Sequence, residues 1–161
     1  DVKLLEEKIL QKLKKKINFI TFRFGTITGI SKGMRFHTAV NKFCLNTIIR
    51  KEIPVWKNAI NQYRPYLSLD DAIKTIITVI NKDLFNGEIY NLLTNNYTVN
   101  NILSLIKNNK YKIKVSETIS PILNQNSYFV SRKKFDKLGI TIKKNISNDI
   151  KNTLNLLKNL Y

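Results

Sequence analysis

Residues 18–33, NFITFRFGTITGISKG, decide the fold class of this chain. Residues 18–24 are rich in Phe, Ile and Thr and favour a β-strand, whereas residues 25–33 hold three glycines and favour a loop. A helix is expected next, over residues 39–50. Its apolar positions recur at helical spacing: Val40, Phe43, Cys44, Thr47 and Ile48.

Helix and strand patterns alternate on both sides of this stretch. Short strands are expected at residues 53–56, 87–93 and 111–115, and helices from Thr98 and over residues 146–161. An amphipathic helix opens the chain, with one apolar face formed by Val2, Leu5, Ile9, Leu13 and Ile17. This alternation indicates an α/β fold.

A further helix is expected after Ser68. Ser68 and Asp71 have the spacing of a capping box, in which each side chain bonds the backbone of the other residue. The isoleucines of this helix recur at helical spacing and predict its buried face: Ile73, Ile76, Ile77 and Ile80. Just before it, Pro65 argues against a central strand, because proline cannot donate to a ladder.

The length and composition exclude several classes of site. With 161 residues, 43% of them apolar, the chain can bury a core of its own. A single cysteine, Cys44, and a single histidine, His37, rule out a disulfide framework and metal centres built from these residues, so no metal is expected. We expect His37 to be structural and Cys44 to be an inert core thiol. No apolar run is long enough for a membrane span, so no membrane partner is expected.

The net charge of +17 raises the question of nucleic acid. Of the 28 basic residues, 23 are lysines spread along the whole chain, and only five are arginines. Arginine is the residue favoured for base edges and for bidentate phosphate contacts. The composition therefore does not favour a nucleic-acid partner, although a basic nucleic-acid-binding domain stays open as an alternative.

Four segments carry a resemblance to a known family. They are residues 23–29 (RFGTITG), 62–72 (QYRPYLSLDDA), 87–92 (GEIYNL) and 127–140 (SYFVSRKKFDKLGI). In this order they resemble the C-terminal portion of the extended short-chain dehydrogenase/reductases, the NAD-dependent epimerase/dehydratase family that acts on nucleotide sugars. The resemblance covers essentially the whole chain. It implies that residues 1–30 are the tail of the Rossmann-like dinucleotide-binding domain, and that residues 31–161 are mainly the smaller substrate-binding domain, with some returning Rossmann elements.

The resemblance also implies the chemistry. Residues 3–10 (KLLEEKIL) place Lys3 as the lysine of the family's catalytic Tyr-x-x-x-Lys pair, whose tyrosine would stand before Asp1. A phenol with a pKa near 10 needs such a positive neighbour to act as a base. Lys3 and Thr26 are expected to bind NAD, which is favoured over NADP. No Gly-x-x-Gly-x-x-Gly loop is present, so we expect a missing N-terminal half to hold most of the cofactor and this chain alone to be inactive.

The same resemblance implies four residues that bind the nucleotide sugar. Arg64 would bind the diphosphate through its planar guanidinium group. Arg35 and Asn41 would lie in the loop and helix that close over the sugar nucleotide, and Tyr128 would line the pocket. Simpler roles stay open for each residue. Arg64 would then pair with an adjacent aspartate, Arg35 and Asn41 would face solvent, and Tyr128 would be a core residue. Lys3 would be an ordinary surface lysine.

Two aromatic residues, Trp56 and Tyr63, are expected in the core rather than beside a sugar or base.

The resemblance finally implies a cytoplasmic enzyme that forms a homodimer through its first helix. The alternative from another class is a non-catalytic binding or dimerisation module, the product of a truncated or split gene. Sequence upstream of Asp1 that encodes a glycine-rich Rossmann half would distinguish the two.

Overall fold

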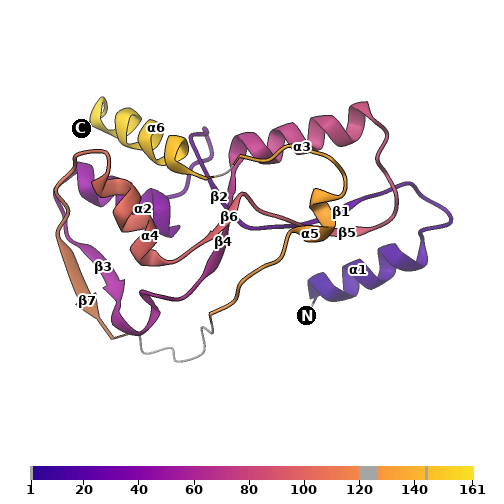
Figure 1. Ribbon diagram of the computed structural model, residues 1–161, viewed down its shortest axis with the longest axis horizontal. Helices are drawn as coiled ribbons and strands as arrows, with labels where there is room; N and C mark the ends of the chain where they lie inside the picture. The colour runs from indigo at the N-terminus through magenta and orange to yellow at the C-terminus, as the bar shows by residue number, and fades with distance from the viewer. Residues whose placement is uncertain (1, 120–126, 144) are drawn as a thin grey trace.

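The computed structural model describes residues 2–119, 127–143 and 145–161. In Figure 1 the elements form two lobes along the longest axis, with a short mixed sheet between them. One lobe holds α1, β1, β5, α3 and α5, and the other holds α2, α4, α6, β3 and β7. The elements are α1 Val2–Lys12, β1 Thr21–Phe24, β2 Thr26–Thr28, α2 Ala39–Ile48, β3 Ile53–Trp56, a 3₁₀ turn Lys57–Ala59, β4 Arg64–Ser68, α3 Leu69–Asn81, β5 Ile89–Leu92, β6 Asn95–Tyr97, α4 Val99–Lys107, β7 Val115–Thr118, α5 Lys133–Asp136 and α6 Ser147–Lys158.

Three small sheets connect these elements. Within the described residues, β1 pairs only with β5, and β3 only with β7, both in parallel. The third sheet has the order β2-β4-β6, with β2 parallel and β6 antiparallel to β4. Helices between parallel strands are the pattern of an α/β protein, so the expected fold class is confirmed.

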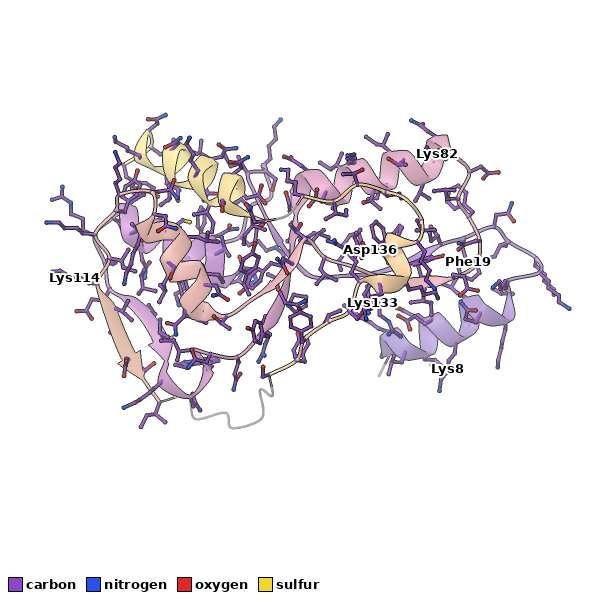
Figure 2. All side chains as sticks on the ribbon, viewed as in Figure 1. Lys8, Phe19, Lys82, Lys114, Lys133 and Asp136 are labelled. Atoms are coloured by element: carbon purple, nitrogen blue, oxygen red, sulfur yellow. The ribbon has the colours of Figure 1, made fainter. Side chains whose placement is uncertain are left out.

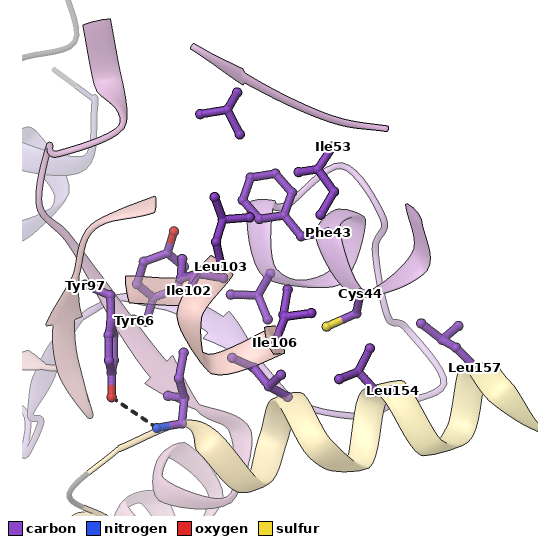
Figure 3. Close-up of a cluster of buried hydrophobic side chains, with 14 residues drawn as sticks. Phe43, Cys44, Ile53, Tyr66, Tyr97, Ile102, Leu103, Ile106, Leu154 and Leu157 are labelled. Atoms are coloured by element: carbon purple, nitrogen blue, oxygen red, sulfur yellow. Dashed lines mark hydrogen bonds between the residues drawn. The ribbon is translucent and has the colours of Figure 1, made fainter. Parts of the chain in front are cut away.

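The core of the second lobe lies between α2, α4 and α6. Figure 3 shows Phe43 and Cys44 of α2 meeting Ile102 and Ile106 of α4 and Leu154 of α6. All are buried, as the sequence spacing of these helices predicts. The core of the first lobe is smaller and is built from Leu67, Ala72, Val79, Tyr90, Leu92, Phe135 and Ile140.

The predicted buried face of α3 is wrong. Its four isoleucines are 42–59% exposed, and the buried face consists of Asp71, Ala72, Thr75 and Val79. Asp71 sets the rotation of the helix, since one carboxylate oxygen accepts from the Thr94 hydroxyl and the other from the backbone N–H of Lys143 at 3.1 Å. These polar contacts turn the face of α3 that carries Ala72, Thr75 and Val79 toward the protein interior.

The predicted capping box at the start of α3 does not form either. Ser68 stands at the N-cap position, but its side chain makes no capping bond. Its hydroxyl donates instead to Asp149 Oδ1 at 3.1 Å. The box forms at α4, where the Thr98 hydroxyl accepts from the backbone N–H of Asn101 and the Asn101 amide accepts from that of Thr98.

The strands differ from expectation at several places, and the sequence did not predict β6. Thr26–Thr28 forms β2 inside the predicted loop, close against β4, and a Cβ on Gly25 would lie 3.0 Å from the Pro65 carbonyl group. The strand expected at 111–115 begins only at Val115, where its pairing with Ile53 starts.

Pro65 does lie in the middle strand of a sheet, contrary to expectation. Pairing of β4 with β2 starts only at Tyr66, so Pro65 faces a single neighbouring strand, at Asn96. At that position β4 is locally an edge, where proline is tolerated.

Candidate functional site

The first turn of α2 is the centre of the candidate site. Thr38 is its N-cap, but the Thr38 side chain makes no capping bond, and the first turn contains no acidic residue. The leading N–H groups of an α-helix have no partner within the helix, and the helix dipole makes this end partly positive. The N-terminus of α2 therefore offers donors suited to an anion.

One cavity of about 300 Å³ borders this turn, and we call it the Arg64 cavity. It contains Arg64 from β4 together with Ala39 and Phe43 from α2. Its other polar and aromatic lining residues are His37, Lys42, Trp56, Gln62 and Tyr66. Burial raises the pKa of Tyr66 to about 12, so its hydroxyl stays protonated at neutral pH and can serve as a donor.

Arg64 is held in a defined orientation. One terminal nitrogen donates to the Tyr63 carbonyl at 2.8 Å and the other to Gln62 Oε1 at 3.1 Å. Its guanidinium carbon lies 4.8 Å from the centroid of the Tyr128 ring, a cation–π distance. Asp70, one of the expected alternative partners of Arg64, bonds Lys143 at 2.7 Å.

A second cavity, of about 390 Å³, borders the same turn and is called the Asn41 cavity. Its lining includes Arg35, Thr38 and Asn41, with Gly29, Gly33 and Leu69 across from them. The Asn41 amide nitrogen donates to the Arg35 carbonyl at 2.9 Å. Asn41 is only 4% exposed, and within the described residues its Oδ1 has no hydrogen-bond partner. A buried acceptor left in this state is expected to take a donor from a ligand or a water molecule.

Four of the six predicted site residues form two pairs, and the other two, Lys3 and Thr26, lie apart from them. Arg64 and Tyr128 meet each other, and Arg35 and Asn41 meet each other, with α2 bordering both cavities. Lys3 lies exposed on α1, and Thr26 lies exposed on β2; neither lines these cavities. Tyr128 is 51% exposed, so it is not the core residue of the simpler interpretation.

The structure also places two aromatic residues, the single histidine and the single cysteine. Trp56 and Tyr63 are 38% and 41% exposed, so their expected place in the core is wrong; Trp56 lines the Arg64 cavity instead. His37 is exposed at the same cavity. Cys44 is fully buried as expected, and this burial raises the pKa of its thiol to about 12.

Sequence reasoning did not single out Lys42 or Gln62. Gln62 lies within the segment that carries the family resemblance, two positions before Arg64, and it bonds that arginine. Lys42 directly follows Asn41, so it points from the next position of the same helical turn into the other cavity. Helical geometry applied to the first turn of α2 would have found Lys42.

Two absences hold for the described part of the chain. It contains no cluster of His, Cys, Asp and Glu that could hold a metal ion. None of its helices combines the length and the apolar character that crossing a membrane requires.

No protein-family model matches this sequence, and no curated protein matches it at a significant level. Solved structures do match. UDP-glucuronic acid 4-epimerase from Bacillus cereus, in complex with UDP-glucuronic acid and NAD, has a TM-score of 0.80 at 17% identity, covering 96% of this chain and 50% of its own. dTDP-glucose 4,6-dehydratase from Bacillus anthracis, in complex with NAD, has a TM-score of 0.73 at 18% sequence identity. This match covers 96% of this chain and 49% of the dehydratase chain. RMD from Pseudomonas aeruginosa, complexed with NADPH, has a TM-score of 0.80 at 12% sequence identity. This match covers 98% of this chain and 55% of the RMD chain.

The chain has the fold of nucleotide-sugar epimerases and dehydratases. It spans about half the length of the solved structures that it matches. The family resemblance stated from the four sequence segments is thereby confirmed at the level of the fold. Three of the four predicted substrate residues, Arg35, Asn41 and Arg64, line the two cavities beside the first turn of α2.

Proposed function

We propose that this chain is the C-terminal, mainly substrate-binding part of an NAD-dependent epimerase or dehydratase that acts on a nucleotide sugar. The observation that carries the proposal is the pair of cavities at the first turn of α2, with Arg64 on one side and Arg35 and Asn41 on the other. The likeness to structures solved with UDP-glucuronic acid and with NAD supports it.

Arg64 and the N-terminus of α2 would bind the diphosphate. A guanidinium presents a planar set of donors that matches two phosphate oxygens at once, and the free N–H groups of the helix add further donors. Stacking on Tyr128 and the bond to Gln62 hold the arginine before the ligand arrives, which reduces the entropy lost on binding.

Asn41 and Arg35 would contact the sugar side of the ligand. Asn41 Oδ1 is a buried acceptor, so a sugar hydroxyl that donates to it would gain a hydrogen bond in a dry site. The Asn41 amide nitrogen donates to the Arg35 carbonyl, which fixes the orientation of the amide.

The remaining chemistry depends on protein outside this sequence. We propose that β1, β5 and residues 1–30 belong with a dinucleotide-binding half, because a parallel sheet of two strands needs further strands for stability. NAD held there would supply the hydride-transfer chemistry. Lys3 would stabilise the phenolate of the tyrosine that the family's Tyr-x-x-x-Lys pair places before Asp1, and both Lys3 and Thr26 would bind the cofactor, Lys3 at its ribose.

A homodimer through α1 belongs to the same proposal. Its residues Val2, Leu5 and Ile9 are 50–70% exposed, and α1 has no buried residue. Polar contacts hold it to the rest of the protein, among them the bidentate bond from Arg23 to Glu7. Such an apolar stripe would be covered by the same helix of a second copy.

The test is Arg64→Ala in the protein completed by its dinucleotide-binding half. Calorimetric titration with UDP and dTDP ligands should show binding weakened by about 1.5–3 kcal/mol, the value of a charge-assisted hydrogen bond. Arg64→Lys should recover part of the loss, because it keeps the charge without the fork. Lys82→Ala, at an exposed lysine in the other lobe, is the charge-matched control. Unchanged affinity combined with a lower melting temperature would show that Arg64 is structural.

A further inference from the structure

A third, larger cavity lies at the opposite end of α2 and belongs to no part of the proposed function. It has a volume of about 770 Å³ and lies where the C-terminal ends of α2, α4 and α6 come together. We call it the basic cavity, because six of its eleven lining residues are cations: Arg50, Lys51, Lys110, Lys112, Lys114 and Lys158. The other lining residues include Tyr111 and Tyr161, and none is acidic.

None of these six cations pairs with a carboxylate within the described residues, a condition they share with other exposed lysines such as Lys8 and Lys82. Elsewhere Lys14 and Lys134 pair with Glu88, Arg23 pairs with Glu7, and Lys143 pairs with Asp70. Within the described residues, none of the six has an ion pair or a side-chain hydrogen bond. Bringing several like charges together in one concave site is unfavourable unless an anion occupies it.

The helix ends alone do not account for this charge. Each helix C-terminus carries roughly half a negative charge, which one nearby cation neutralises. The three helix ends therefore balance only a minority of the six cations. A positive surplus of exposed cations therefore remains around the cavity and attracts anions to it.

The backbone gives a second, independent observation. Arg50 and Lys110 have φ values of 56° and 65°, in the left-handed region, and they follow the ends of α2 and α4. This position after a helix is usually glycine, as at Gly139 after α5, where φ is 69°; away from the cavity, Asp83 after α3 is a further non-glycine case, with a φ of 50°. At both turns beside the basic cavity the chain instead has a cation, at a conformational cost.

We propose that the basic cavity binds an anion with several consecutive phosphate groups, such as a polyphosphate or the triphosphate of a nucleotide. Lysines act as point charges for phosphate oxygens, and Arg50 adds a planar fork. The volume is that of a small-molecule site and not of a long groove that follows a nucleic-acid backbone. Tyr111 supplies a half-buried ring beside the cations.

This site is distinct from the candidate diphosphate site. The Arg64 cavity uses the first turn of α2, at Ala39, and the basic cavity uses its last turn, at Ile48. With a rise of 1.5 Å per residue, the two ends of the helix lie about 14 Å apart. A ligand at one site therefore leaves the other open.

The test compares two triple variants with the same net charge. The pocket variant carries Lys112→Gln, Lys114→Gln and Lys158→Gln, and the control variant carries Lys8→Gln, Lys82→Gln and Lys133→Gln. Figure 2 shows Lys8, Lys82 and Lys133 in the other lobe from Lys114. All six lysines are exposed, so both variants should fold.

Inorganic tripolyphosphate is titrated into each protein by calorimetry at low and at physiological salt. We expect about one site in the wild type, a loss of roughly tenfold or more in the pocket variant and about twofold or less in the control, with a shallower salt dependence for the pocket variant. Equal losses in the two variants would show a general effect of net charge and overturn the proposal. Absence of binding to the wild type, or tighter binding of a single-stranded oligonucleotide at the same lysines, would also overturn it.

Arg50→Gly gives a readout that does not depend on the triple variants. Glycine adopts a φ of 56° without strain, so this change should raise the melting temperature while it weakens tripolyphosphate binding. A rise in stability with unchanged binding would contradict a role for Arg50 in the site. A fall in stability would contradict the argument that the arginine is kept there at a conformational cost.

Discussion

The hydroxyl of Thr28 donates a 2.9 Å hydrogen bond to Asp149 Oδ2, although 121 positions separate the two residues. The other carboxylate oxygen of Asp149 accepts from the Ser68 hydroxyl at 3.1 Å and lies 3.6 Å from Lys143 Nζ. Thr28, Ser68 and Asp149 are all buried. One carboxylate therefore connects β2 and β4 of the central sheet to the start of α6.

Replacing that carboxylate should destabilise the protein. Asp149→Ala leaves two buried hydroxyls without their acceptor, and we expect a loss of about 2–4 kcal/mol in the free energy of unfolding. Urea unfolding followed by circular dichroism measures it. Asp136→Ala, at a half-exposed carboxylate that pairs with Arg132, should cost less than about 1 kcal/mol. Similar losses at the two positions would refute the connecting role of Asp149.

The two faces of α3 should respond differently to truncation. Val79 is 2% exposed, so Val79→Ala should cost about 1–2 kcal/mol through the lost methyl groups and the space they leave. Ile77 is 52% exposed, so Ile77→Ala should change stability by less than about 0.5 kcal/mol in this chain. Chemical unfolding of both variants measures the difference. The reverse order would mean that the isoleucine stripe is buried.

The N-cap residues of α4 and α2 should contribute unequally to the stability of the protein. Thr98→Ala removes one half of a formed capping box and should cost about 1 kcal/mol. Thr38→Ala removes an N-cap hydroxyl that makes no capping bond, so a change of a few tenths of a kcal/mol is expected. Thermal melts of the two variants, compared with wild type, test the difference, and equal losses would contradict it.

Stability should fall in acid partly through Glu88. Hydrogen bonds from Lys134 and Lys14 lower the pKa of this carboxyl from 4.5 to about 2. A lowered pKa means that the carboxylate contributes stability above about pH 4.5 and loses it as the pH falls toward about 2. Urea midpoints measured across this range should therefore decline less steeply in Glu88→Gln than in wild type. Parallel curves would show that Glu88 contributes nothing.

Cys44 should be unreactive in the folded protein. It is fully buried, and its thiol has a pKa of about 12, so almost no thiolate exists at neutral pH. A disulfide reagent such as Ellman's reagent should label it only after denaturant is added. Rapid labelling under native conditions would show that the core between α2, α4 and α6 opens readily.

Some features of the candidate site could be predicted from the sequence, whereas others depend on contacts between residues far apart in it. The resemblance carried by the four sequence segments implied the importance of the segment around Arg64 and named the four residues predicted to bind substrate. The stacking of Arg64 on Tyr128 does not, because the two residues stand 64 positions apart and only the folded chain brings them together. The unpartnered Asn41 Oδ1 and the basic cavity are likewise products of packing between separate elements.

The sequence by itself predicted helices α1, α2, α3, α4 and α6 and strands β1, β3 and β5, and it determined which face of α6 is buried. Ile146, Ile150 and Leu154 recur at helical spacing and are all 0% exposed. The isoleucines of α3 follow the same spacing, yet they face outward. Only the tertiary structure decided that orientation, because Asp71 is held by Thr94 and Lys143. These two partners lie 23 and 72 positions away from Asp71 in the sequence. Periodicity shows which residues share a face of a helix, whereas burial depends on what packs against that face.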